Sequence, residues 1–185
     1  MTKKLIREVL FECLKEKDIN KITISSLCEK ADINRSTFYL HYSDIYQMLQ
    51  KIEEEALENI TCMLTDSPVD FSDKESTLAF TTKFFSILDG DKDLCRALLG
   101  PHGDMAFVEQ IENLLASTFL KQLPGRFSKD DPDLKYAYAF TLNGCVGLIK
   151  VWLSQPVQES PAHMAELTCC LIENTTQGYL NILTK

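Results

Sequence analysis

Residues that break helices are scarce in this chain. Its 185 residues include 7 glycines and 6 prolines, about 7% of the sequence, where globular proteins average about 12%. The apolar residues between them recur at the spacing of an α-helix. One such stripe consists of Leu5, Ile6, Val9, Leu10, Cys13 and Leu14. Since no segment shows the alternation of a strand, the sequence predicts an all-α fold.

Helical periodicity and turn signals predict about nine helices. The predicted ranges are 2–17, 24–31, 35–42, 45–64, 72–88, 92–99, 104–123, 132–154 and a last helix from 161 almost to the end. The second and third helices are short and joined by a tight turn, with an apolar helix before them and a long one after, as in a helix-turn-helix domain, which we place at residues 1–46. A long helix joins this domain to a helical bundle, and the second domain is placed at residues 47–185.

Several classes of protein do not fit the sequence. No apolar run approaches the roughly 20 residues of a membrane-spanning helix, and acidic residues interrupt the N-terminal segment, so we expect a cytoplasmic protein without a membrane partner. The seven cysteines contain no C-x-x-C pair, and we expect most of them to be small core residues in a reducing compartment; redox sensing by a pair of them stays open.

Chemistry that needs a cofactor or metal is not indicated either. The three histidines, His41, His102 and His163, lie far apart without companions at ligand spacing, so no metal site is predicted. We find no nucleophile–base pair and no phosphate-binding glycine loop, and Glu53-Glu54-Glu55 is typical of a solvated helix face. We therefore expect no cofactor and no enzymatic activity.

Charge is divided unevenly along the chain. The formal net charge is −8, but residues 1–51 hold nine basic and seven acidic side chains, whereas the remainder holds ten and twenty. A slightly basic head on a strongly acidic body can present one face to a polyanion such as DNA.

The second helix of the predicted helix-turn-helix has the composition of a DNA-reading element. Its sequence, Arg35-Ser36-Thr37-Phe38-Tyr39-Leu40-His41-Tyr42, offers hydrogen-bond donors on a helix short enough to enter a major groove. Phe38 and Leu27 can anchor the helix pair in the core. The alternative is an ordinary helical hairpin, which would not need so many exposed donors.

This segment resembles the DNA-binding domain of TetR-family transcription regulators. The resemblance covers about fifty residues and is carried by Thr23-Ile24, Leu27-Cys28, Ala31 to Asn34 and, above all, Thr37-Phe38-Tyr39-x-His41-aromatic. Three positions depart from the family pattern: Asp32 replaces the usual turn glycine, which suggests a different turn geometry, Cys28 replaces an alanine, and Ile45 replaces a lysine that touches phosphate. The resemblance implies DNA binding through Thr23, Asn34, Arg35, Ser36, Thr37, Tyr39, His41 and Tyr42.

Within that set the resemblance implies different roles. Phosphate contacts are expected from Thr23, Ser36, Thr37, Tyr39 and His41, and base-edge contacts from Arg35, Ser36 and Tyr39. Two alternatives stay open: Tyr42, like Phe38, can be a packing residue, and His41 can instead cap the helix C-terminus.

The C-terminal two-thirds loosely resembles a Gram-positive subgroup of the family that includes regulators of dihydroxyacetone-kinase operons. This likeness is carried by the segments Leu98 to Asp104, Tyr138 to Phe140, Gly144 to Ile149 and Ser160-Pro161. Family members usually keep a small-molecule pocket in this part of the chain. The mixed aromatic and polar residues expected nearest to it, with plain core or surface as the alternative, are Phe84, Phe85, His102, Phe107, Tyr138, Asn143 and Trp152.

The last two helices are too apolar for a monomer with one wet face. Gly144 and Gly147 remove side chains where a second backbone can approach. We expect a homodimer whose interface includes Gly144, Gly147, Val151, Leu171, Gly178 and Tyr179; the alternative is that these helices close their own subunit's core.

Together these features predict a sequence-specific DNA-binding transcription regulator, a ligand-responsive repressor that binds a near-palindromic double-stranded operator as a homodimer. Two alternatives remain open. The first is an activator of the same fold controlled by a partner protein. The second is a helical protein-binding module without DNA binding.

Overall fold

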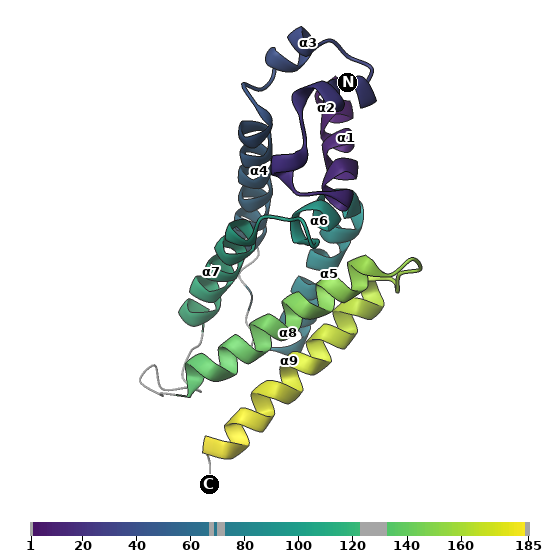
Figure 1. Ribbon diagram of the computed structural model, residues 1–185. Coiled ribbons are helices and arrows are strands. Elements are labelled where there is room, and N and C mark those ends of the chain that lie inside the picture. Colours follow the sequence, from purple (N-terminus) through teal and green to yellow (C-terminus); the bar gives the residue numbers. More distant parts are fainter. Residues whose placement is uncertain (1, 67–68, 70–72, 123–132, 184–185) are drawn as a thin grey trace. The chain divides into compact units, whose positions relative to one another are not determined.

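The protein is helical throughout the part of the chain that the structure describes. The computed structural model describes residues 2–66, 69, 73–122 and 133–183, which form nine α-helices, one short 3-10 helix and no strand (Figure 1). The helices are α1 Thr2–Glu16, α2 Ile24–Lys30, α3 Arg35–Tyr39, α4 Ile45–Asp66, α5 Lys74–Gly90, α6 Lys92–Leu99, α7 Met105–Gln122, α8 Leu134–Ser154 and α9 Pro161–Leu183, and the 3-10 helix η1 is Ile19–Lys21. The predicted all-α fold is confirmed.

The chain divides into two compact units. Unit 1 holds the residues up to Cys62 together with Lys92–Gln110, and unit 2 holds Met63–Asp91 together with the described residues from Ile111 onward. Unit 1 thus contains α1 to α3, most of α4, α6 and the start of α7. This division differs from the predicted one near residue 46, because α6 is distant in sequence from the helix-turn-helix but packs against α1.

Unit 1 is built around the apolar face of α1. Ile6, Leu10, Cys13 and Leu14 recur at i, i+4, i+7 and i+8, and all four are buried. This face packs against α2 and α6, and α2 packs against α3. A small core therefore fixes the helix-turn-helix to both its preceding helix and a later part of the chain.

Unit 2 is a helical bundle in which α9 packs against α5 and α8. Phe85 of α5 meets the ring of Trp152 of α8 edge-on, with ring centroids 5.3 Å apart. Buried apolar residues such as Met164 and Ala165 on α9 complete this core. Because the three helices bury apolar area against one another, their mutual packing is the main source of stability in this unit.

One acidic side chain in unit 1 lies where a charge is unfavourable. Glu53 of α4 is half-buried, and its buried Oε1 atom has no hydrogen-bond partner. Burial, and to a lesser extent the negative charge of Asp104, raises the pKa of Glu53 to about 7. The carboxyl group of Glu53 therefore binds its proton more tightly in the folded protein than in the unfolded chain.

We expect Glu53→Gln to stabilise the protein above neutral pH. Since the folded pKa lies above the unfolded value of 4.5, the free energy of unfolding of the parent protein falls as pH rises from about 4.5 to about 7. The amide removes that loss, and with the solvent around the half-buried group taken into account the gain at pH 8 is about 1–2 kcal/mol. Urea unfolding at pH 4 and pH 8 measures it.

Glu54→Gln is the matched control, because the neighbouring Glu54 is exposed and pairs with Gln50 on the helix surface. It should leave the pH dependence of unfolding as it is in the parent. Equal behaviour of the two variants at both pH values would contradict the assignment to Glu53.

Candidate nucleic-acid interface and ligand pocket

The helix-turn-helix begins with a capping box. Thr23 occupies the N-cap of α2, its hydroxyl accepts a hydrogen bond from the backbone N–H of Ser26, and the Ser26 side chain accepts one in return from the backbone N–H of Thr23. These bonds satisfy two donors that the first turn of a helix leaves without intrahelical partners. The hydroxyl of Thr23 is therefore engaged in the cap of α2.

The turn between α2 and α3 depends on a left-handed residue. Asp32 has φ of 49°. Its backbone N–H donates to the carbonyl of Glu29, and that of Ile33 donates to the carbonyl of Cys28, the pair of bonds that closes a Schellman motif. The turn thus has the geometry that a glycine at this position favours, in contrast to the altered geometry expected from Asp32.

We expect Asp32→Gly to stabilise the protein by about 0.5–1 kcal/mol. Relief of the left-handed conformation is worth about 1–2 kcal/mol for residues with a Cβ, and the greater entropy of glycine in the unfolded chain offsets part of it. The urea midpoint measures the gain. Asp32→Ala, which keeps a Cβ and loses the tolerance of aspartate for this conformation, should show no gain; a rise as large as that of the glycine variant would contradict the explanation.

The second helix of the helix-turn-helix, α3, is shorter than predicted. α3 ends at Tyr39 instead of Tyr42, because the backbone N–H groups of His41 and Tyr42 both donate to the carbonyl of Phe38 and form a tight turn after the helix. This turn directs Tyr42 back into the core, where its side chain is 2% exposed and its ring centroid lies 5.8 Å from that of Phe38. The structure therefore gives Tyr42 the packing role that was the alternative to DNA contact.

The other predicted DNA-binding side chains lie at the surface of the same segment. Asn34, Arg35, Ser36, Tyr39 and His41 are exposed, and Tyr39 is 56% exposed. Thr37 is partly buried. Asn34 occupies the N-cap of α3 without a side-chain capping bond, so its amide stays available to a partner outside the helix. The anchor of this surface is Phe38, which is fully buried.

Arg35 is already oriented by a neighbouring helix. Its Nη2 atom donates to the hydroxyl of Ser25 on α2 at 2.7 Å. A guanidinium carries five N–H donors, so this bond leaves enough of them for a two-pronged contact with a guanine edge. The role of Ser25 was missed at the level of sequence, where no local pattern marks it as a partner of Arg35.

Two apolar residues near α3 behave in opposite ways. Leu40 follows α3 directly and is 81% exposed. It lies one helical turn after the exposed Ser36, so its position indicates exposure even though its side chain is apolar. Ile45, which replaces the family's phosphate-binding lysine, is buried at the start of α4. The aliphatic side chain thus contributes to the core and offers no charge to a phosphate.

Ion pairs connect α1 to α4, the helices that precede and follow the α2–α3 pair. Lys3 and Arg7 of α1 both contact the carboxylate of Glu55 on α4, Lys3 at 3.0 Å. Burial alone would raise the pKa of Glu55, but the hydrogen bonds and positive charges of Arg7 and Lys3 outweigh it and hold the pKa below its usual value. These side chains fix α1 against α4 within unit 1.

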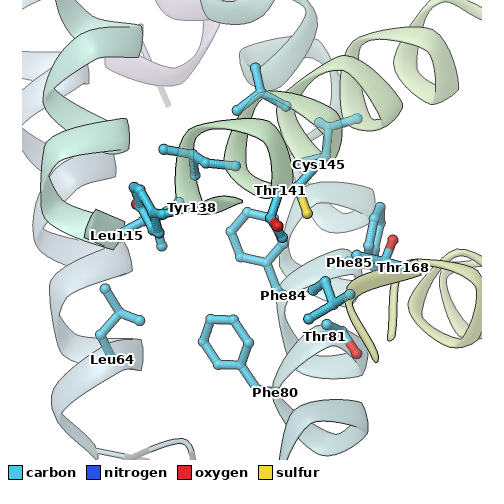
Figure 2. Close-up of a pocket in the computed structure, with 14 residues that line it drawn as sticks. Leu64, Phe80, Thr81, Phe84, Phe85, Leu115, Tyr138, Thr141, Cys145 and Thr168 are labelled. Atoms are coloured by element: carbon cyan, nitrogen blue, oxygen red, sulfur yellow. The ribbon is translucent and has the colours of Figure 1, made fainter. Parts of the chain in front are cut away.

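Unit 2 contains a pocket of about 120 Å³, and all of its described lining residues belong to that unit. Figure 2 shows Phe80 and Phe84 projecting from α5, with Leu115 and Tyr138 on the other side of the space. The lining consists of Leu64, Phe80, Thr81, Phe84, Phe85, Leu115, Tyr138, Thr141, Leu142, Cys145, Val146, Ile149, Thr168 and Ile172. The walls are therefore almost entirely apolar.

Three of the seven residues predicted for such a pocket line it in the structure. Phe84, Phe85 and Tyr138 line it. Trp152 contacts Phe85 from behind the wall, and its indole N–H donates to the carbonyl of Glu159.

The other three predicted pocket residues lie elsewhere. Asn143 is exposed, and its amide donates to the carbonyl of Ala139. His102 and Phe107 belong to unit 1, where the imidazole Nδ1 lies 2.7 Å from a carboxylate oxygen of Asp18 and Phe107 is buried.

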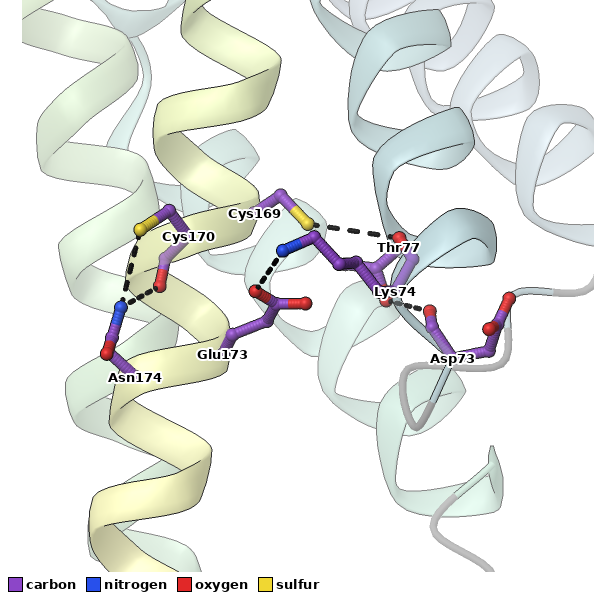
Figure 3. Close-up of polar contacts among 7 residues, drawn as sticks. All are labelled: Asp73, Lys74, Thr77, Cys169, Cys170, Glu173 and Asn174. Carbon is purple, nitrogen blue, oxygen red and sulfur yellow. Dashed lines mark hydrogen bonds and ion pairs between the residues drawn. The ribbon is translucent and has the colours of Figure 1, made fainter.

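Polar contacts join two of the helices that form the pocket. The ammonium of Lys74, at the start of α5, lies 3.0 Å from the carboxylate of Glu173 on α9, and the thiol of Cys169 donates to the carbonyl of Lys74 at 4.0 Å (Figure 3). The N-cap Asp73 accepts from the backbone N–H of Ser76. These contacts link the start of α5 to α9 beside the pocket wall.

The outer faces of α8 and α9 are apolar and exposed. Val151 is 60% exposed and Leu171 is 50% exposed. Gly144, Gly147 and Gly178 are exposed as well, and a Cβ added to any of them would meet no atom within 4 Å. Tyr179, the remaining predicted interface residue, is partly buried. Five of the six residues thus lie on open helix surface.

Among the residues that the structure describes, no group of three or more histidine, cysteine, aspartate or glutamate side chains is arranged to hold a metal ion. No helix within the described ranges has the length and apolar character needed to cross a membrane.

The chain is similar to known transcriptional regulators. Residues 75–174, more than half of the chain, match the TetR_C_8 family model, described as a transcriptional regulator C-terminal region. Over 62 residues, 34% of the chain, the sequence is 32% identical to an uncharacterized HTH-type transcriptional regulator, YxbF, of Bacillus subtilis. That stretch spans only 16% of the length of YxbF.

Two solved structures share the fold. The fatty acid degradation regulator FadR from Bacillus halodurans superposes with a TM-score of 0.69 at 12% identity, over 92% of this chain and 94% of the other. The dihydroxyacetone kinase operon activator DhaS superposes with a TM-score of 0.56 at 16% identity, over 94% and 95%. With the family model matched over most of unit 2 and a helix-turn-helix in unit 1, the chain belongs to the TetR family of helix-turn-helix transcriptional regulators.

Proposed function

We propose that this regulator is a ligand-responsive repressor that binds a near-palindromic operator as a homodimer. The observation that carries the proposal is α3, a short helix anchored by the fully buried Phe38 with Arg35, Ser36 and Tyr39 exposed around it. A helix of this kind can insert into a major groove while its parent domain stays outside.

The exposed side chains divide into two groups by chemistry. Arg35 and Tyr39, together with the hydroxyl of Ser36, read base edges. Asn34, Thr37 and His41 hold phosphates, and Thr23 supports them through the cap that fixes the start of α2. Tyr42 is left out because its side chain is buried.

Dimerisation is supported by the outer faces of α8 and α9. An exposed face that combines Val151 and Leu171 with three open glycines gives two copies of the same surface a close approach about a twofold axis. The family's pairing of two reading helices then requires half-sites about one DNA turn, roughly 34–36 Å, apart.

A response to a ligand is supported by the pocket of unit 2. This apolar pocket is lined mainly by α5, α8 and α9, and α8 and α9 are also the helices whose outer faces we assign to the dimer. A ligand changes operator affinity to the extent that it binds two arrangements of the dimer with different affinity. Repression follows when the unliganded arrangement is the one that fits the operator.

Selection of DNA from a random duplex library at physiological salt tests the proposal. We expect enrichment of a near-palindrome and binding that weakens steeply as salt rises, because each neutralised phosphate releases counterions. A reporter gene behind the selected operator then gives the sign of regulation, and repression is the expected result. Failure to enrich any sequence would instead favour a helical module that binds proteins.

A further inference from the structure

Leu40 is a large apolar side chain at the surface of the helix-turn-helix. It is 81% exposed and directly follows α3, the helix that carries the exposed Arg35, Ser36 and Tyr39. A single exposed leucine is common on protein surfaces and by itself requires no explanation. What distinguishes Leu40 is its position on the helix that we assign to the major groove.

The helical geometry of α3 continues through Leu40. The backbone of Leu40 has φ of −67° and ψ of −21°, and its N–H donates to the carbonyl of Ser36, four residues earlier, at 3.2 Å. An α-helix turns about 100° per residue, so positions two residues apart lie on nearly opposite sides of the axis. Ser36 and Leu40 are each two residues from the fully buried Phe38. Both therefore point away from the core.

Leu40 thus lies near the middle of the outward face of this helix, with other side chains at its flanks. Arg35 is three residues from Phe38 and Tyr39 is one, which places them about 60° and about 100° from the buried ring around the axis. The position of Arg35 near a flank agrees with its hydrogen bond to Ser25 on α2. A groove that accepts this helix meets the side chain of Leu40 directly.

The chemistry of leucine restricts what it can contact in a major groove. Its side chain has no hydrogen-bond donor or acceptor, so it binds neither a phosphate nor the polar edge of a base. The base pairs present one apolar group in this groove, the C5-methyl group of thymine. Against any other base edge the leucine would cover polar groups that water satisfied before binding, which is unfavourable.

We infer that Leu40 contacts the C5-methyl group of a thymine in each half-site of the operator and thereby specifies a T·A pair at that position. Removal of the leucine side chain and the methyl group from water supplies the preference. This inference rests on the proposed binding of a homodimer to DNA. It adds a residue that recognises an apolar group to those that recognise hydrogen-bonding groups.

Replacement of thymine by uracil in the selected operator tests the inference, because uracil lacks only the methyl group. In gel-shift titrations at constant salt, one thymine position at a time is changed to uracil in both half-sites. We expect at least one position at which uracil weakens binding of the parent protein about tenfold or more. Burial of one methyl group corresponds to about fourfold in affinity, and the operator contains it twice. Leu40→Ala should bind the thymine and uracil operators of that position within about twofold of each other.

Met105→Ala is the matched control. Met105 is also a large apolar residue of unit 1 and is 72% exposed, but it lies at the start of α7, outside the helix-turn-helix. Its removal should leave the thymine preference of the parent unchanged. Leu40→Met, which keeps an apolar side chain of similar volume, should retain most of that preference. Since Leu40 is exposed, thermal unfolding of Leu40→Ala should match that of the parent.

Three results would overturn the inference. They are equal binding of thymine and uracil operators at every position, a selected operator without thymine in its half-sites, and a Leu40→Ala variant that keeps the thymine preference of the parent. In each of these cases a selected operator exists, so DNA binding stands and only the role of Leu40 fails. Absence of any selected operator would contradict the proposed function itself, and the inference with it.

Discussion

Val151→Glu is expected to separate the two subunits of the proposed dimer. Val151 is 60% exposed on the face of α8 that also carries Gly144 and Gly147, and a twofold interface would bury it twice. Each glutamate would have to lose its hydration among apolar groups, which amounts to several kcal/mol for the pair and weakens the dimer about a hundredfold or more. Sedimentation over a concentration series measures the dissociation constant, and operator affinity should fall with it.

Val157→Glu is the matched control for this prediction. Val157 is 87% exposed, but it lies in the connection between α8 and α9 instead of on the glycine-containing face. The same chemical change there should leave the dimer intact. If both variants dimerise as the parent does, or both dissociate equally, the interface does not lie where we propose it.

Arg35→Ala is expected to remove most of the sequence selectivity. A two-pronged contact between arginine and guanine discriminates against a wrong base by about 1–3 kcal/mol. The proposed dimer would make this contact in both half-sites, so the ratio of operator to random-duplex affinity should fall about thirtyfold or more. Since Arg35 is exposed on α3, the melting temperature and the dimer should be unchanged.

Arg35→Lys separates charge from geometry. Lysine keeps the positive charge but lacks the planar fork, so the salt dependence of binding should stay close to that of the parent while selectivity falls. Competition gel shifts with operator and random duplex over a salt series measure both quantities. Full selectivity in the alanine and lysine variants would mean that α3 does not read the operator through Arg35.

The helices themselves could be predicted from sequence because their determinants are local. The spacing of Ile6, Leu10 and Cys13 and the cap at Thr23 each act over a few residues, and the structure has the corresponding helices. The end of α3 could not be predicted in this way. Whether residues 40–42 continue the helix depends on the burial of Tyr42 against Phe38, which is a tertiary contact.

The two candidate sites also differ in whether their residues are close together in the sequence. The donors of the helix-turn-helix lie within one short segment, so their composition indicated a shared surface. The pocket combines α5, α8 and α9 with the ends of α4 and α7, and nothing local in the sequence distinguishes Phe84, which lines it, from Phe107, which lies in the other unit.

The hydrogen bond between Arg35 and Ser25 has a consequence for the thermodynamics of association. A long side chain that moves freely in the unbound protein loses about 0.5–1.5 kcal/mol of rotational entropy when a complex immobilises it. In this protein the bond to Ser25 already orients the guanidinium in the unbound state. On binding to DNA as we propose, part of that entropic loss has therefore occurred during folding, and the free energy of binding is correspondingly more favourable.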